Sequence, residues 1–210
     1  MKRFIAAFLL LACALASRAN GLDNLEEFIR SAKSGRAEFT QVVTSPAREG
    51  QAARSKTSVG DFEFARPNRF RFDYRKPFVQ TIVADGQTLW LYDADLNQVT
   101  ARQQNAVLGS TPAALIASAE DTATLRRDFQ LEADGEKDGL QWVLATPLAK
   151  DGQLHSIRLG FRGKDLALLE IQDSFGQRSV LTFSKMELNV PIAADRFRFK
   201  PPQGAQVLRQ

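Results

Sequence analysis

The sequence predicts a mainly β protein with a few helices (α+β), folded as an incomplete antiparallel β-barrel of about ten or eleven strands closed by short lid helices. Two observations predict this class. Most of the chain beyond residue 38 alternates apolar and polar residues with a period of two, as strands with one buried face do. Short turns join these stretches in hairpin order, and a sheet of this kind curls into a barrel or a deep half-barrel.

Residues 1–19 have the pattern of an export signal. Lys2 and Arg3 precede an unbroken apolar run, which is shorter than the roughly 20 apolar residues that span a bilayer. Small residues then stand at the positions that a signal peptidase reads, so we expect cleavage near Ala19. Residues 20–210 then remain as a single domain of an exported protein.

Cys13 allows a second interpretation of this segment. Residues 10–13 read Leu-Leu-Ala-Cys, a passable lipobox, and lipidation of Cys13 would leave a membrane-anchored protein. The apolar run continues past the cysteine without a break, which favours cleavage near Ala19. Cys13 is the single cysteine of the chain, so we expect the exported domain to hold together without disulfide bonds.

The charge balance argues against a nucleic-acid partner. The chain holds 28 basic and 24 acidic residues, and three of the basic ones lie in the expected signal, which leaves 25 against 24 in the exported domain. A nucleic-acid binder would show a clear basic excess or a basic stripe. We therefore expect no nucleic acid among the partners.

An amphipathic helix is expected at the start of the exported domain. Apolar residues recur there at intervals of three and four, with charged residues between them. Gly35 is expected to end the helix. The apolar stripe, which must lie against another part of the domain, consists of Leu22, Leu25, Phe28, Ile29 and Ala32.

The period-two stretches give the expected strands. Asp85-Gly86 is a strong hairpin signal between two of them. The stretches are 39–43, 62–64, 70–74, 80–84, 88–93, 96–101, 129–133, 140–146, 157–161, 166–172 and 178–188, with a last short one at 197–199.

One face of the expected sheet is aromatic. Arg69 and Arg71 have the outward parity of their strand, and the rings beside them have the inward parity. Such rings either line a hollow that takes an apolar guest or fill an ordinary packed core, and the pattern of the rings alone favours neither. The inward rings are Phe39, Phe62, Phe64, Phe70 and Phe72.

A short apolar helix is expected within residues 109–118, between the two sets of strands. Thr111 suits the N-cap and Pro112 suits the first helical position. The helix has almost no polar side and must be buried, although connections between strands usually lie at the surface. A lid across the mouth of an apolar hollow satisfies both conditions. The apolar residues of this lid are Leu115, Ile116 and Ala117.

Arg66 has two interpretations. If the alternation continues from Phe64, the guanidinium of Arg66 points toward the apolar side and needs hydrogen-bond acceptors, which carbonyl groups of the lid could supply. Alternatively, Arg66-Pro67-Asn68 forms a turn, which breaks the alternation and leaves the arginine in solvent.

The chain shows no pattern of catalytic or metal-binding residues. His155, the single histidine, lies in a turn and has no neighbour suited to nucleophilic or metal chemistry. A serine elbow, a phosphate-binding glycine loop and a set of Cys and His ligands are all missing. We expect no enzymatic activity, no metal and no cofactor.

Four blocks of the sequence resemble the family of periplasmic outer-membrane lipoprotein carriers, LolA. Within the longest block, Arg-Pro-Asn-x-Phe and Asp-Gly-x-x-Leu-Trp are specific together, and the blocks follow one another in order over nearly the whole exported domain. The blocks are AEFTQ at 37–41, the stretch 65–102, GSTPAALIA at 109–117 and DRFRFKPPQG at 195–204.

The resemblance implies a monomeric periplasmic carrier whose incomplete barrel is closed by helices. Such a carrier takes acylated lipoproteins from an inner-membrane ATP-binding-cassette release complex and delivers them to an outer-membrane receptor. The residues to which the resemblance assigns roles are Arg66 as the lid latch, Phe70 and Phe72 as cavity wall, Ile116 and Ala117 as the apolar lid pair, and Ile29 as a contact on the first helix.

Two other functions fit the same residues. One is a periplasmic carrier or sensor of other hydrophobic molecules. The other is a membrane-anchored receptor of the same fold, which requires lipidation of Cys13. The C-terminal block FKPPQGAQVL fits the soluble carrier better.

Overall fold

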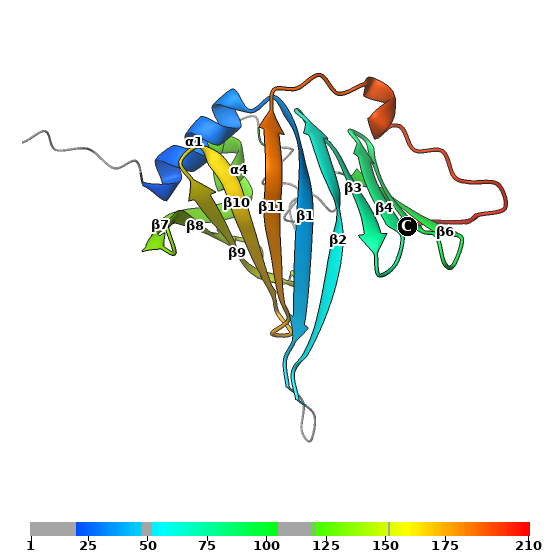
Figure 1. Cartoon of the computed structure of the whole chain (residues 1–210), viewed down its shortest axis with the longest axis horizontal. Coiled ribbons are helices and arrows are strands. Elements are labelled where there is room, and N and C mark those ends of the chain that lie inside the picture. The colour runs from blue at the N-terminus through cyan, green and yellow to red at the C-terminus, as the bar shows by residue number, and fades with distance from the viewer. Residues whose placement is uncertain (1–19, 48–51, 105–118, 120, 151) are drawn as a thin grey trace, which may run out of the picture.

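The computed structural model describes residues 20–47, 52–104, 119, 121–150 and 152–210, and Figure 1 shows how they are arranged. The expected signal at 1–19, with Cys13, and the expected lid at 109–118 lie outside these residues.

Strands dominate the described part of the chain. The helices are α1 (Gly21–Ser31), α4 (Thr122–Asp128) and the 3-10 helix η1 (Ala194–Phe197). The strands are β1 (Ser34–Ser45), β2 (Arg54–Ala65), β3 (Arg69–Lys76), β4 (Gln80–Asp85), β5 (Thr88–Asp93), β6 (Gln98–Gln103), β7 (Phe129–Lys137), β8 (Leu140–Pro147), β9 (Leu154–Arg162), β10 (Asp165–Asp173), β11 (Arg178–Leu188) and β12 (Gln206–Arg209).

All of these strands form one 12-stranded sheet in the order β12-β6-β5-β4-β3-β2-β1-β11-β10-β9-β8-β7. Neighbouring strands are antiparallel, except that β12 runs parallel to β6. The sheet curves around α1 and α4, and its two end strands do not pair with each other (Figure 1). The predicted incomplete barrel is confirmed, with twelve strands instead of ten or eleven.

The expectation of hairpin order throughout is wrong at two places. β1 pairs with β11 over nearly its whole length, from Gly35 opposite Leu188 to Thr44 opposite Arg178. This long-range pair joins the two sets of hairpins at the centre of the sheet (Figure 1). Its register places the apolar faces of both sets on the same side of the sheet, where they are buried together. The second exception is β12, which returns across the chain to lie beside β6.

The first helix ends earlier than expected. Asn20 and Asp23 form a capping box at the start of α1, and Ala32 caps its end. The next residue, Lys33, is bonded to the residues that directly follow β2 and β11: its carbonyl accepts from the Arg66 amide at 2.8 Å and its amide donates to the Asn189 side chain at 2.9 Å. The chain is therefore extended before it reaches Gly35, the residue expected to end the helix.

Two further differences lie outside the alternating stretches. The expected strand at 197–199 is absent, because Phe197 is the buried last residue of the 3-10 turn η1 and the ring of Phe199 packs 5.6 Å from the ring of Trp90. The short helix α4 follows Asp121, whose carboxylate accepts from the Thr124 amide at 2.7 Å as an N-cap. Neither α4 nor β12 was expected from the sequence.

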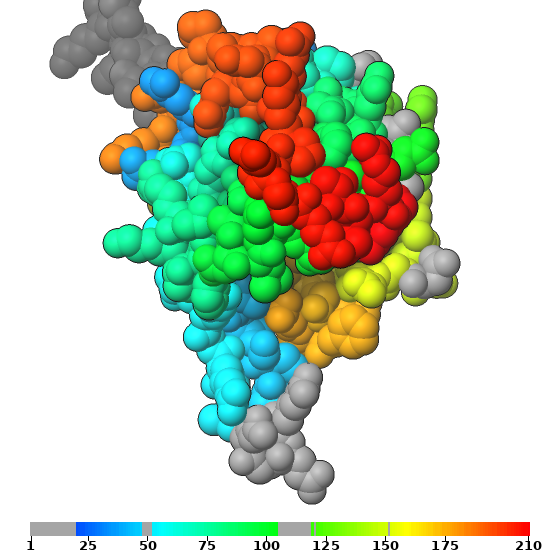
Figure 2. All heavy atoms as spheres, turned by 90° about the vertical axis from the view of Figure 1, so that its right-hand side faces the viewer, coloured from blue at the N-terminus to red at the C-terminus, as the bar shows by residue number. Residues whose placement is uncertain are grey.

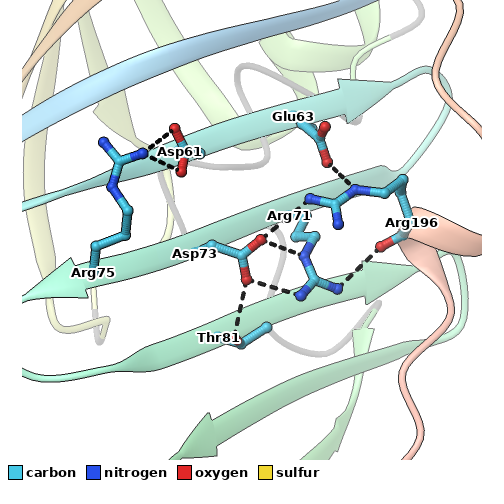
Figure 3. Close-up of polar contacts among 7 residues, drawn as sticks. All are labelled: Asp61, Glu63, Arg71, Asp73, Arg75, Thr81 and Arg196. Carbon is cyan, nitrogen blue, oxygen red and sulfur yellow. Dashed lines mark hydrogen bonds and ion pairs between the residues drawn. The ribbon is translucent and has the colours of Figure 1, made fainter.

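The outer face of the sheet carries paired charges (Figure 3). Asp73 accepts two hydrogen bonds from Arg71 and one from Thr81, and Arg196 of η1 bonds to Glu63 at 2.7 Å. The outward parity of Arg71 is thus confirmed. Exposed ion pairs contribute little to the stability of a fold, so most of the stabilising contacts must lie on the apolar inner face of the sheet.

Gly60 in β2 allows the inner face to close. A Cβ atom at this position would lie 2.2 Å from the Asp73 carbonyl oxygen and 2.7 Å from Cζ of Phe39. We expect Gly60→Ala to lower the free energy of unfolding by about 1–3 kcal/mol, because backbone and ring must both move. Urea denaturation measures this change. The matched control is Gly152→Ala, where a Cβ would meet only the Leu154 amide nitrogen, at 3.9 Å. Equal midpoints for the two variants would contradict the tight packing at Gly60.

Candidate functional site

Five phenylalanines from three adjacent strands meet on the inner face of the sheet. Phe62 lies opposite Phe72, and Phe64 lies opposite Phe70, in the register of β2 and β3. Phe39 comes from β1, and all five side chains are buried. Period-two alternation brings them to one face because residues at i and i+2 of a strand point the same way. We call Phe39, Phe62, Phe64, Phe70 and Phe72 the inner aromatic cluster.

The rings of this cluster contact one another. The centroid of the Phe72 ring lies 4.5 Å from Phe62, 5.5 Å from Phe39 and 6.0 Å from Phe70. Rings at such separations gain attraction beyond the burial of their surface. Within the described residues, the rings expected on the cavity wall are therefore brought together and packed against each other. The space beneath Leu115, Ile116 and Ala117 involves residues that the structure does not describe.

The first helix joins the cluster through its apolar stripe. The ring of Phe28 lies 6.2 Å from the ring of Phe64 and 6.0 Å from that of Phe161. Ile29, the predicted contact on this helix, is buried and belongs to the same core. The helix therefore covers part of the inner face, as its sequence pattern predicts.

Arg66 points inward, to the apolar side of the sheet. Its Nε donates to the carbonyl oxygen of Ala32 at 2.8 Å, and its Nη1 donates to that of Ala119, also at 2.8 Å. The centre of the guanidinium lies 5.5 Å from the ring of Phe64 and 5.7 Å from that of Phe28. Residues 66–68 do form the expected turn, but the guanidinium still points inward, so the inward interpretation is confirmed and only the expected solvation of the arginine is wrong.

The surroundings of Arg66 disfavour its charge. Burial lowers the pKa of the guanidinium to about 10. No carboxylate among the described residues pairs with it, and its buried Nη2 has no hydrogen-bond partner among them. Two backbone carbonyls and the faces of two rings therefore replace the favourable contacts that the guanidinium would make with water.

The two acceptors belong to segments far apart along the chain. Ala32 caps the end of α1, and Ala119, which is buried, is the first described residue after the expected lid. Arg66 thus links the turn after β2 to both segments. Leu115, Ile116 and Ala117 themselves lie outside the described residues.

An open pocket of about 580 Å³ lies on the inner face next to the aromatic cluster. We call it the basic pocket, because Arg54 and Lys56 are its charged groups and its described lining holds no carboxylate. The lining residues are Gln41, Val43, Ser45, Arg54, Ser55, Lys56, Ser58, Tyr74, Gln80, Ile82 and Gln177.

A chain of polar side chains crosses the border between the cluster and this pocket. The hydroxyl of Tyr74 donates to Oε1 of Gln41 at 2.9 Å, and Nε2 of Gln41 donates to the hydroxyl oxygen of Ser179 at 2.7 Å. The Tyr74 ring lies 5.0 Å from that of Phe39, and burial raises the pKa of Tyr74 to about 12. The Tyr74 hydroxyl therefore stays protonated and acts as a donor at neutral pH.

The sequence-based predictions did not include the basic pocket. Its signal is present in β2, where the inward parity of Phe62 continues toward the start of the strand as Gly60, Ser58, Lys56 and Arg54. Following one parity to the end of the strand would have shown that the inner face changes from aromatic to basic.

No helix in the described part of the chain has the length and apolar character to cross a bilayer.

Two solved structures were found to be similar, and the first of them shows the same fold. A conserved protein from Thermus thermophilus aligns with a TM-score of 0.54 at 13% identity, over 90% of this chain and 96% of that one. A LolA superfamily protein from Nitrosomonas europaea aligns with a TM-score of 0.48 at 13% identity, over 87% of this chain and 99% of that one.

Relatives in sequence are much closer. A protein of Albidiferax ferrireducens named outer-membrane lipoprotein carrier protein is 60% identical over 99% of this chain and 100% of its own length. A protein of Leptothrix cholodnii with the same name is 53% identical over 96% of this chain and 93% of its own length. The family model described as outer membrane lipoprotein carrier protein LolA matches residues 30–200, and the chain therefore belongs to the LolA family.

Proposed function

We propose that the chain is a periplasmic carrier that binds the acyl chains of outer-membrane lipoproteins. It takes them from an inner-membrane ATP-binding-cassette release complex and delivers them to an outer-membrane receptor. The observation that carries the proposal is Arg66, which lies on the inner aromatic cluster and bonds to Ala32 and Ala119 on two covering segments. Family membership supports it, since relatives such as the 60% identical one bear the carrier name.

Export fits the start of the domain. Asn20 accepts hydrogen bonds from the amides of Leu22 and Asp23 as the N-cap of α1. Cleavage near Ala19 leaves this cap in place, so the helix that covers the inner face begins at the new N-terminus. Residues 20–210 then act as a single carrier domain.

The acyl chains bind against the inner face. In the arrangement described, the rings contact one another, so a chain enters as the rings and the segments covering them separate. The residues assigned to this binding surface are Ile29, Phe39, Phe62, Phe64, Phe70, Phe72, Leu115, Ile116 and Ala117.

The free energy of this separation makes binding reversible. Burying one methylene contributes roughly 0.8 kcal/mol, so one long acyl chain contributes on the order of 10 kcal/mol. Opening the site breaks ring contacts and the two hydrogen bonds of Arg66, and this cost subtracts from the affinity. A carrier needs such an offset because it must release its cargo to a receptor.

The substitution Arg66→Leu tests the latch. Leucine keeps an apolar contact with the rings but cannot bond to the two carbonyls, so the closed, empty state loses stability relative to the loaded one. We expect cargo to load normally and transfer to the receptor to slow by about tenfold, because a loss near 1.4 kcal/mol has that effect. Transfer of a labelled lipoprotein from purified carrier to receptor-containing membranes measures the rate.

The matched control is Arg75→Leu, which removes a guanidinium that bonds to Asp61 on the outer face (Figure 3). This variant is expected to transfer cargo at the normal rate. If the Arg66→Leu variant is folded, as judged by circular dichroism, and still delivers cargo at the normal rate, Arg66 is not the latch.

The identity of the cargo is tested by co-purification. Mass spectrometry of the protein isolated from periplasm is expected to find acylated polypeptides bound to it. Loose lipid alone would point to a carrier or sensor of other hydrophobic molecules. The intact mass also decides the state of the N-terminus, since a chain starting near residue 20 without acyl groups excludes the anchored receptor.

A further inference from the structure

The inner face changes its chemistry along the strands. On β1, the inward residues pass from Phe39 to Gln41, and on β11 they pass from Phe183 to Ser179 at the same level as the basic pocket. On β2 they pass from Phe62 to Lys56. One end of the inner face is therefore apolar, its middle carries neutral hydrogen-bonding groups, and its other end is cationic. An elongated amphiphile has the same order of groups.

The cations of the basic pocket have no ion-pair partner among the described residues. Lys56 Nζ lies 4.2 Å from the ring centroid of Phe78, and no described carboxylate pairs with Arg54. This contrasts with the outer face, where Arg36 and Lys185 each pair with a glutamate. Asp93 lies in the neighbouring pocket of about 210 Å³ and accepts from Gln80.

A hydrogen-bond donor is available on β11 at the level of Lys56, since both Ser179 and Lys56 lie opposite Val43 of β1. The hydroxyl oxygen of Ser179 accepts from Gln41, and its own hydrogen has no partner among the described residues. Ser179 is 8% exposed, and it lies opposite Val43 of β1, which lines the basic pocket. Ester and amide carbonyls of an acylated cysteine are acceptors that this donor fits.

The basic pocket opens beyond the body of the sheet. β3 ends its pairing with β2 at Lys76 opposite Val59, whereas β1 and β2 continue to Ser45 opposite Arg54. The ends of β1 and β2 therefore project past β3 (Figures 1 and 2), whereas β11 accompanies β1 as far as Thr44. A polypeptide attached to an acyl chain on the inner face has a path to solvent along this projection.

We propose that the basic pocket binds the first residues of the acylated polypeptide and favours acidic side chains there. This inference rests on the proposed function and adds a preference for cargo sequence. The acyl chains lie on the inner aromatic cluster, the carbonyls near the acylated cysteine lie at Ser179, and acidic residues that follow the cysteine lie beside Arg54 and Lys56.

Two synthetic lipopeptides test the preference. Both carry a diacylglyceryl cysteine and a serine, followed by four glutamates in one and four lysines in the other, with a fluorophore at the C-terminus. Fluorescence anisotropy at low salt is expected to show about five- to tenfold tighter binding of the glutamate peptide, since each exposed cation contributes modestly. The difference is expected to shrink in 0.5 M salt, where exposed charges are screened over roughly 4 Å.

The charge-reversed variant Arg54→Glu/Lys56→Glu is expected to prefer the lysine peptide. Its control is Arg162→Glu/Lys164→Glu, which makes the same charge change in the β9–β10 turn at the opposite end of the strands and is expected to keep the wild-type preference.

Each outcome decides one claim. Equal affinities for the two peptides, or an unchanged preference in the charge-reversed pocket variant, would overturn the pocket assignment while leaving the carrier role in place. Failure of the wild-type protein to bind either lipopeptide would overturn the carrier role itself.

Discussion

A guanidinium held against two phenylalanine rings constrains the whole inner face. Arg66 has lost much of its water, as the fall of its pKa to about 10 indicates, so its hydrogen bonds offset a desolvation cost that is already present. Both acceptors are backbone carbonyls, at Ala32 and Ala119. The side chain therefore fixes where two segments of backbone lie, and moving either one leaves a buried donor without its partner. The hydrogen bonds stabilise the closed arrangement, and the desolvation of the guanidinium limits that stability.

The central strand β1 connects the two halves of the inner face. β1 pairs with β2 on one side and β11 on the other, so the inward residues of both halves form one face. Glycines allow the rings to approach the sheet: Phe64 lies over Gly35, and Phe39 lies over Gly60. A side chain at either position would push a ring outward. Strand pairing and ring packing thus depend on the same few positions.

Period-two alternation predicted most of this structure because one face of each strand is buried and the other is hydrated. β11 has the bounds expected from the pattern, and the inward rings meet as their parity requires. Local sequence did not decide the rest. β12 has four exposed residues and exists because the chain returns to β6. Arg66 stands in a turn-like tripeptide, and its two acceptors lie 34 and 53 residues away, so no local pattern reveals that it points inward.

Packed rings and a carrier role are compatible when binding has two stages. The aromatic cluster is closed, whereas the basic pocket beside it is open to solvent, so charged groups are available before any ring has moved. Attraction between exposed charges acts mainly on the rate of encounter, and buried contacts act mainly on the rate of dissociation. On the proposed function, Arg54 and Lys56 therefore govern how cargo arrives and Arg66 governs how it leaves. Because the basic pocket and Arg66 lie at different positions along the strands, a substitution in one can change the rate of association or of dissociation without changing the other rate.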